Sequence, residues 1–198
     1  MKTLIISILF AGFLMNTLPA QEVDRQLNEA HQAYQAGKLQ DSRHALQQAL
    51  HDIDLLIGAE ILKLLPQSLG QMETQESEDH ISSMGIAGIL VSRNYVYNEG
   101  EKSASVNIMG DSPMLAGVNA LLSLPVFIGD SNQKRIRVGG QRALLQKNDD
   151  GEGRISWDVQ VPMGTTLLSF NATGFDDENT ITEMVNSFPV EEIARLTR

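Results

Sequence analysis

Apolar and polar residues alternate without a break over residues 154–161, and this pattern predicts a half-buried β-strand. Its apolar face would consist of Ile155, Trp157, Val159 and Val161. Shorter strand-like runs occupy residues 135–138, 142–145 and 166–172. Turn residues separate these runs, with Gly139 and Gly140 at one turn and residues 148–151 at the next. We therefore expect a meander of consecutive antiparallel strands.

Two further runs, at residues 86–97 and 103–108, predict another β-hairpin. A helix is expected over residues 114–122, where nearly every side chain is apolar, so it should be buried against the sheet. Asp111 or Ser112 would cap this helix. Near the C-terminus, residues 176–178 place negative charge at the start of a helix, and Pro189 starts a short final helix. These elements predict an α+β fold, in which a curved antiparallel sheet of about six strands is covered by two or three helices.

Between residues 22 and 65 the apolar pattern has a helical period. Gly37 lies where the first of two helices would end. The two apolar stripes are Val23, Leu27, Ala30 and Tyr34, followed by Leu39, Ala45, Leu46, Ala49, Leu50 and Ile53. We divide the chain accordingly into a signal peptide (1–20), a helical hairpin (21–66), an acidic linker (67–80) and an antiparallel α+β domain (81–198).

The hairpin resembles a single tetratricopeptide repeat, with small residues where two helices cross closely and a glycine at the turn. The residues concerned are Ala30, Tyr34, Gly37, Leu39, Ser42, Leu46 and Ala49. Ser42 stands where that family usually has alanine, and Asp54 stands where proline usually ends the repeat. The resemblance implies that one repeat cannot bury its own face and needs a neighbour. That neighbour is either the sheet of the same chain or another chain.

The C-terminal part resembles the last unit of PsbP-like α/β sandwiches. The features that match are a strand followed by a helix that ends in Val185-Asn186-Ser187-Phe188. The resemblance implies a curved antiparallel sheet covered by helices. Families of this shape include many exported binding or assembly proteins that are not enzymes.

Residues 1–20 have the order of a bacterial secretory signal, with a basic start at Lys2, an apolar run and a cleavage site after Ala20. The apolar run is shorter than the roughly 20 residues that span a membrane, and Pro19 breaks it. We expect a periplasmic or secreted protein without stable membrane insertion after cleavage.

Composition excludes several classes of function. The chain has no cysteine, which rules out disulfides, thiolate catalysis and cysteine-based metal sites. Its formal net charge is −10, and binding of a phosphate backbone relies on clustered lysine and arginine. Nucleic acid is therefore not an expected partner.

The tripeptide Gly-Asp-Ser follows a strand-like run twice, at residues 110–112 and 129–131. It resembles the nucleophile block of GDSL-type hydrolases, which implies a serine activated by a downstream histidine. The last histidine is His80, upstream of both serines. We therefore expect Ser112 to cap a helix and Ser131 to lie in a turn, while a serine hydrolase using Ser112 stays the alternative.

Two patterns suggest metal binding. His44 and His51 would share one face of the second helix, and Asp41 or Asp52 could add an oxygen ligand. Exposed histidines on a helix explain the same spacing. The acidic run at 148–152 suggests calcium, but an EF-type loop counted from Gln146 would have Trp157 at its twelfth position instead of an acid. We expect no metal and no cofactor.

One basic cluster lies in this acidic chain, formed by Lys134, Arg135, Arg137, Arg142 and Lys147. Arg135, Arg137 and Arg142 could form a patch for an anionic ligand or an acidic partner. A solvated strand face balanced by Asp149, Asp150 and Asp158 is the alternative. Tyr95 and Tyr97 could line a groove, or pack across strands.

The sequence therefore predicts an exported, non-enzymatic binding or assembly module of unknown ligand. Its protein partner, or a second copy of the chain, would dock on the hairpin at 22–65. A serine hydrolase and a homo-oligomeric structural protein are the alternatives.

Overall fold

The computed structural model describes residues 19–85, 88–97, 101–124, 132–149, 151 and 153–197. Helices α1 (Pro19–Gln35) and α2 (Leu39–Leu64) form the N-terminal hairpin. Short elements follow: β1 (Ser68–Leu69), β2 (Met72–Thr74), the 3-10 helix η1 (Glu76–Glu78) and β3 (His80–Ser83). The longer elements are β4 (Ile89–Tyr97), β5 (Lys102–Met109), α3 (Leu115–Ser123), β6 (Gln133–Val138), β7 (Gln141–Asp149), β8 (Ile155–Met163), β9 (Thr166–Thr173), α4 (Glu178–Asn186) and α5 (Val190–Leu196).

All strand pairs are antiparallel, and the strand order is β1-β2-β4-β5-β9-β8-β7-β6, with β3 also paired to β4. The meander β6 to β9 and the hairpin β4–β5 are confirmed, and so is the α+β fold class. The described residues contain nine strands instead of about six. The three additional strands, β1, β2 and β3, have two to four residues each, which is too short for a clear alternating pattern.

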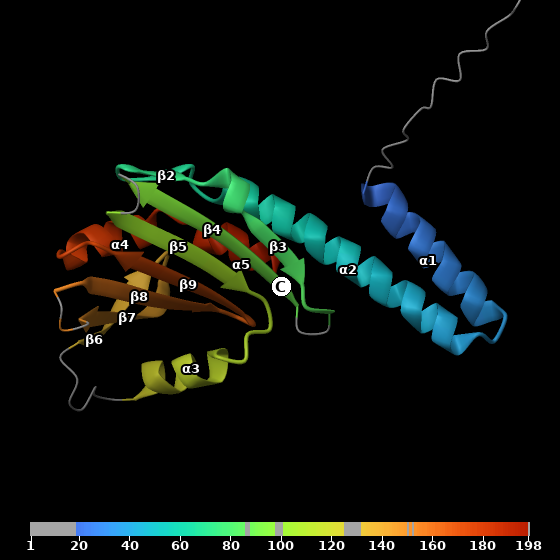
Figure 1. Cartoon of the computed structure of the whole chain (residues 1–198). Helices are drawn as coiled ribbons and strands as arrows, with labels where there is room; N and C mark the ends of the chain where they lie inside the picture. Colours follow the sequence, from blue (N-terminus) through green and yellow to red (C-terminus); the bar gives the residue numbers. More distant parts are fainter. Residues whose placement is uncertain are drawn as a thin grey trace, which may run out of the picture.

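Alternation along the strands divides the sheet into two faces, and one face is covered by helices. Trp157, Val159 and Val161 of β8 are buried on that face. Helices α4 and α5 and the inner half of α2 lie on it (Figure 1). Phe188, just after α4, packs against Phe170 of β9 with ring centroids 5.7 Å apart.

Helix α3 lies on the other face of the sheet. Val118 and Leu122 are buried against Leu144 of β7 and Leu167 of β9. The expectation that α3 would be buried was only partly right, because one stripe contacts the sheet while the opposite side is exposed. A single helix at the margin of a sheet has a neighbour on one side only.

The two C-terminal helices, α4 and α5, begin where the sequence predicts. The Asp177 carboxylate accepts a hydrogen bond from the Thr180 backbone N–H at 3.0 Å and so caps α4. Helix α5 follows Pro189. The turn between β6 and β7 uses Gly139 and Gly140, both with positive φ, as a two-residue hairpin requires.

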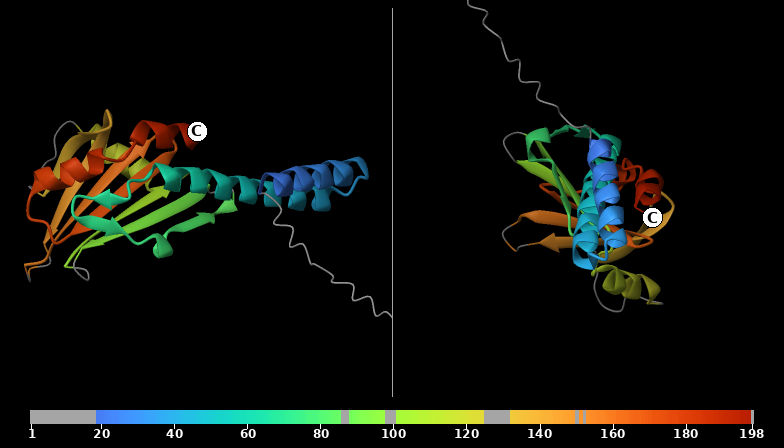
Figure 2. Two further views of the ribbon diagram at one scale, coloured as in Figure 1. Left: turned by 90° about the horizontal axis from the view of Figure 1, so that it is seen from above. Right: turned by 90° about the vertical axis from the view of Figure 1, so that its right-hand side faces the viewer.

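Helix α2 connects the sheet to the projecting hairpin. It has 26 residues, which corresponds to roughly 39 Å at 1.5 Å per residue. Its inner half packs on β3 and β4, and Gly58 permits the contact, because a Cβ there would lie 2.3 Å from Cγ2 of Ile81. Its outer half lies beside α1 and projects past the sheet (Figure 2).

Residues 67–80, which we expected to connect the hairpin to the sheet, contain β1, β2 and η1. Leu69 and Met72 are buried in the main core. The polar composition of this segment reflects its exposed side chains, whereas its two large apolar residues anchor it. The expected signal peptide, apart from the start of α1, lies outside the described residues, as does Ser131.

Candidate interaction surfaces

Small side chains allow α1 and α2 to pack closely. Ala30 and Ala49 are buried, and the buried hydroxyl of Ser42 donates a 2.9 Å hydrogen bond to the carbonyl oxygen of Ala30. The bond satisfies a polar group at a position where the helices cross. Nearer the start of α1, Nε2 of Gln26 donates to Oδ2 of Asp52 at 2.7 Å.

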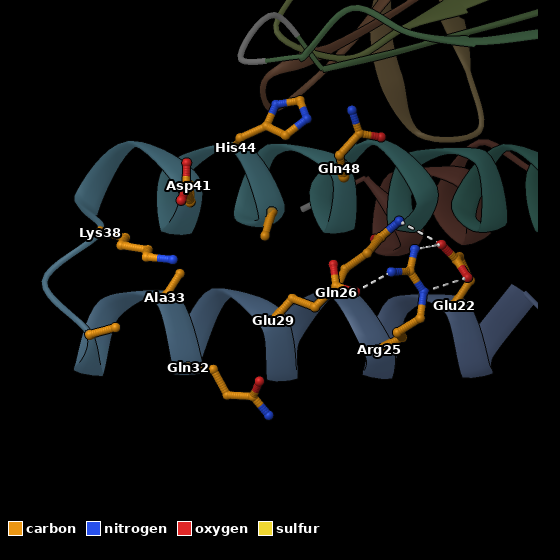
Figure 3. Close-up of a pocket in the computed structure, with 12 residues that line it drawn as sticks. Glu22, Arg25, Gln26, Glu29, Gln32, Ala33, Lys38, Asp41, His44 and Gln48 are labelled. Carbon is orange, nitrogen blue, oxygen red and sulfur yellow. Dashed lines mark hydrogen bonds and ion pairs between the residues drawn. The ribbon is translucent and has the colours of Figure 1, made fainter.

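One side of the hairpin is a polar groove of about 700 Å³ between the two helices (Figure 3). Within it, Arg25 binds both Glu22 and Glu29. These bonds raise the pKa of Arg25, and the hydrogen bond from Arg25 lowers the pKa of Glu22. Near the start of α1, the positive charge of Arg25 is therefore paired with the negative charges of Glu22 and Glu29. The other lining residues are Gln26, Gln32, Ala33, Ala36, Lys38, Asp41, His44, Ala45 and Gln48.

Helical geometry fixes what lies on the opposite side of the hairpin. A groove residue immediately precedes a buried contact residue on both helices, as in Arg25-Gln26 on α1 and His44-Ala45 on α2. On both helices, the residues just before the buried contact residues line one groove. The residues just after the buried contact residues therefore lie together on the opposite side of the hairpin.

Five large apolar residues are exposed on this side, whereas the positions that follow Ala30 and Ser42 are the polar His31 and Arg43. We call this surface the apolar flank, and it consists of Leu27, Tyr34, Leu39, Leu46 and Leu50. Their exposed fractions are 44, 66, 62, 46 and 57% respectively. Leu27, Tyr34, Leu46 and Leu50 each follow a residue that faces the groove or the helix contact, and Leu39 lies two turns before Leu46 on the same stripe. Large apolar side chains gathered on a surface indicate an interaction site.

The basic cluster is divided between the two faces of the sheet. Register places Arg137 directly opposite Arg142, and Arg135 opposite Leu144, so the three arginines share the face that α3 occupies. Lys134 lies on the other face and forms an ion pair with Glu178 at 2.5 Å. Arg135 donates to the carbonyl oxygens of Leu121 and Leu124, at the C-terminal end of α3.

This arrangement gives Arg135 and Arg137 structural partners. Arg135 stabilises the end of α3 by binding carbonyl groups that lack helical partners. Arg137 donates to the carbonyl oxygen of Gly140 at 3.3 Å. Of the predicted balancing acids, Asp158 accepts from Asn148 and Asn171, and Asp150 lies outside the described residues.

The two tyrosines have different environments although they share a face of β4. Tyr95 is fully buried, and its hydroxyl donates to the carbonyl oxygen of Pro66 at 2.8 Å. Burial raises its pKa to about 12. Of the two alternatives for Tyr95, the side chain therefore packs in the core instead of lining a groove, because its strand position faces the core. Tyr97 is half-buried and lines a cleft of about 630 Å³ beside Phe175 and Lys102.

Sequence reasoning missed a buried ion pair beside these tyrosines. Arg93 is 4% exposed and binds Asp79 through two hydrogen bonds, and it also donates to the carbonyl oxygen of Leu65 at 3.1 Å. The bonds to Asp79 raise the pKa of Arg93. The sequence contains a signal, since Arg93 occupies an apolar position in the alternation between Val91 and Tyr95.

The face of the sheet away from α2, α4 and α5 carries polar side chains that form hydrogen bonds with one another. Asp158 accepts from Asn148 at 2.6 Å and from Asn171 at 2.8 Å, across three neighbouring strands. Ser92 and Asn107 are 2.6 Å apart on β4 and β5. Each of these side chains therefore has a hydrogen-bond partner within the sheet.

Ser112 lies in the connection after β5. Its residue is 6% exposed, and its hydroxyl accepts a 3.3 Å hydrogen bond from the backbone N–H of Met114. The helix starts one residue later than expected, and Met114, not Ser112 or Asp111, is its N-terminal cap position. Ser112 therefore stabilises the turn that leads into α3.

His44 and His51 are exposed on α2, and Asp52 is engaged by Gln26. The Asp149 carboxylate accepts from the backbone N–H of Gly151, which has positive φ, as in a tight turn. Across the described part of the chain there is no group of three or more side chains arranged to hold a metal ion.

No family model and no characterised protein matches this chain. Among the helices of the described residues, none is both long and apolar enough to cross a membrane.

Proposed function

We propose that this protein is an exported, non-enzymatic assembly module that binds a protein partner on the apolar flank of its α1–α2 hairpin. The observation that supports the proposal is the exposure of five large apolar side chains on one side of a projecting helix pair. Leaving such surface in water costs about 25 cal/mol for each Å². A partner that covers it would recover that free energy.

The two sides of the hairpin and the sheet differ in a way that favours this surface. In the polar groove Arg25 is paired with Glu22 and Glu29, and on the polar sheet face Asp158 accepts hydrogen bonds from its neighbours on β7 and β9. The apolar flank is instead a surface that only another apolar surface can complement. The sequence of residues 1–20 supports export, and a fusion of these residues to a reporter should be exported and cut after Ala20.

Site-specific photocrosslinking in the native host tests the binding site. A benzophenone amino acid replaces Leu50 on the apolar flank or, as the matched control, Gln48 on the groove side. The two positions lie on the same helix within one turn of each other, so expression and folding should be alike. We expect a protein adduct from position 50 and none from position 48. Absence of an adduct at position 50 contradicts the proposal.

The enzyme alternative has its own test. If the purified protein hydrolysed esters and the Ser112→Ala variant did not, the non-enzymatic assignment would be wrong. We expect no such activity, because Ser112 is buried and bonded to the turn before α3.

A further inference from the structure

We infer that the partner on the apolar flank is a second copy of this chain, so that two hairpins associate into a four-helix bundle. This inference rests on the proposed function and adds the identity of the partner. It depends on the spacing, the arrangement and the extent of the flank.

The spacing of the flank residues matches a helical partner. Leu27 and Tyr34 are seven residues apart on α1, and Leu39 and Leu46 are seven apart on α2. Leu50 follows Leu46 by four residues. Intervals of seven and of four are those of a coiled-coil seam, in which apolar side chains stay aligned along the helix and fit between those of a facing helix.

The seam of α2 continues toward the sheet. After Leu46 and Leu50, Ile53 follows at an interval of three and is half-buried, and the stripe ends there because Ile57, four residues further, packs against the main core. Position 43, which precedes Leu46 by three, is Arg43 and interrupts the stripe near the tip. A single polar residue of this kind restricts the register in which two seams can pair.

The flank has two rows of side chains, one from each helix. Contact with every side chain of both rows favours a partner that itself offers two aligned rows at the same spacing. A second hairpin meets this requirement, and the result is the four-helix bundle, in which helices pack close to antiparallel. A symmetric dimer uses the same patch on both subunits, so one chain supplies both surfaces.

The extent of the flank also suits a dimer. The five side chains are 44 to 66% exposed and together present on the order of a few hundred Å² of apolar surface. A stable interface buries about 800 Å² on each partner, including its polar rim. The outer part of the hairpin, where α1 and α2 turn, projects past the sheet in Figure 1 and in the left view of Figure 2, which leaves room for a second hairpin.

Size-exclusion chromatography with light scattering on residues 21–198 tests this inference. We expect twice the mass of one chain. The double variant Leu39→Glu/Leu50→Glu should have the mass of one chain, because it places charges in the seam. The matched control Gln32→Glu/Gln48→Glu adds the same charge on the groove side and should stay dimeric. Circular dichroism should show that both variants are folded.

If the glutamate variant does not fold, the milder Tyr34→Gln/Leu39→Gln variant at the exposed tip replaces it and should dissociate likewise. A wild-type monomer at tens of micromolar, or a flank variant that stays dimeric, would overturn the inference. Dissociation of the groove-side control would overturn it as well.

The crosslink from position 50 separates this inference from the proposed function. An adduct of two copies supports both. An adduct with a different protein, together with a wild-type monomer, overturns the second copy and leaves the proposed binding site intact. If no adduct forms, both are wrong.

Discussion

The guanidinium of Arg93 and the carboxylate of Asp79 form a two-point ion pair inside the protein, with Nε 2.9 Å from Oδ1 and Nη2 2.5 Å from Oδ2. Asp79 lies between η1 and β3, and Arg93 lies on β4, so the pair fixes the segment after α2 to the sheet. The third bond of Arg93, to the carbonyl oxygen of Leu65, binds the end of α2 to the same point.

This arrangement predicts a large loss of stability when one partner is removed. Arg93→Met leaves a largely buried carboxylate without its cation, and we expect a loss of about 3 kcal/mol in the free energy of unfolding. Asp79→Asn should also destabilise the fold. Urea unfolding followed by circular dichroism measures both effects.

The double variant Arg93→Met/Asp79→Leu is the informative control. It removes both charges, so it should lose less stability than the sum of the two single variants, by about 1 kcal/mol or more. Strictly additive losses would mean that the two side chains do not depend on each other, contrary to the geometry.

Tyr95 gives a prediction for alkaline pH. Burial raises its pKa from 10.0 to about 12, so the folded protein holds the phenolic proton more tightly than the unfolded chain does. The resulting stability is fully present below pH 10 and is lost as the pH rises toward 12. Tyr95→Phe should lack this part of the alkaline loss, and it should cost about 1 kcal/mol at neutral pH, because the bond to Pro66 is removed.

Unfolding curves at neutral and alkaline pH test this prediction against Tyr34→Phe, which alters an exposed tyrosine of the hairpin. The Tyr34 variant should keep the alkaline loss of the wild-type protein. If Tyr95→Phe and the wild-type protein lose stability in parallel above pH 10, the buried phenol of Tyr95 does not contribute to the alkaline loss.

Two glycines on helices predict opposite effects of the same substitution. Gly117 in α3 has no atom within 4 Å of an added Cβ, so Gly117→Ala should stabilise the protein by about 0.5–1 kcal/mol through helix propensity. Gly58→Ala in α2 would place Cβ 2.3 Å from Cγ2 of Ile81 and should destabilise by about 1–3 kcal/mol. Thermal unfolding of both variants measures the difference. A stabilised Gly58 variant would show that β3 can move away from α2 at little cost.

Much of the fold follows from local pattern. The alternation at 154–161 and the turn residues at 139–140 correctly predicted β8 and the turn before β7, because strand period and positive φ are properties of short segments. The helical period at 22–65 predicted α1 and α2 in the same way. Strands β1, β2 and β3 were missed. These segments are too short to show an alternating pattern, and they form strands only because β1 pairs with β2 and because β2 and β3 pair with β4.

The candidate surfaces were harder to predict than the elements. The sequence led us to expect docking on the hairpin, yet it placed the apolar residues of each helix on one undivided stripe. In the structure Ala30 and Ala49 face the other helix. Leu27 and Leu50 lie beside them, on the exposed side of the same helices. Which part of a stripe is covered depends on the direction from which the second helix approaches, and local periodicity does not contain that direction.

The sequence by itself determined the α+β class, the two N-terminal helices, the meander and the glycine turns, because each depends on residues that are near one another in the chain. Only the tertiary structure decided that Tyr95 is buried, that Arg135 binds the end of α3 and that Arg93 pairs with Asp79. These outcomes depend on strand order and on the packing of helices against the sheet. Both are set by the burial of apolar surface between segments far apart in sequence, and that burial is a property of the whole chain.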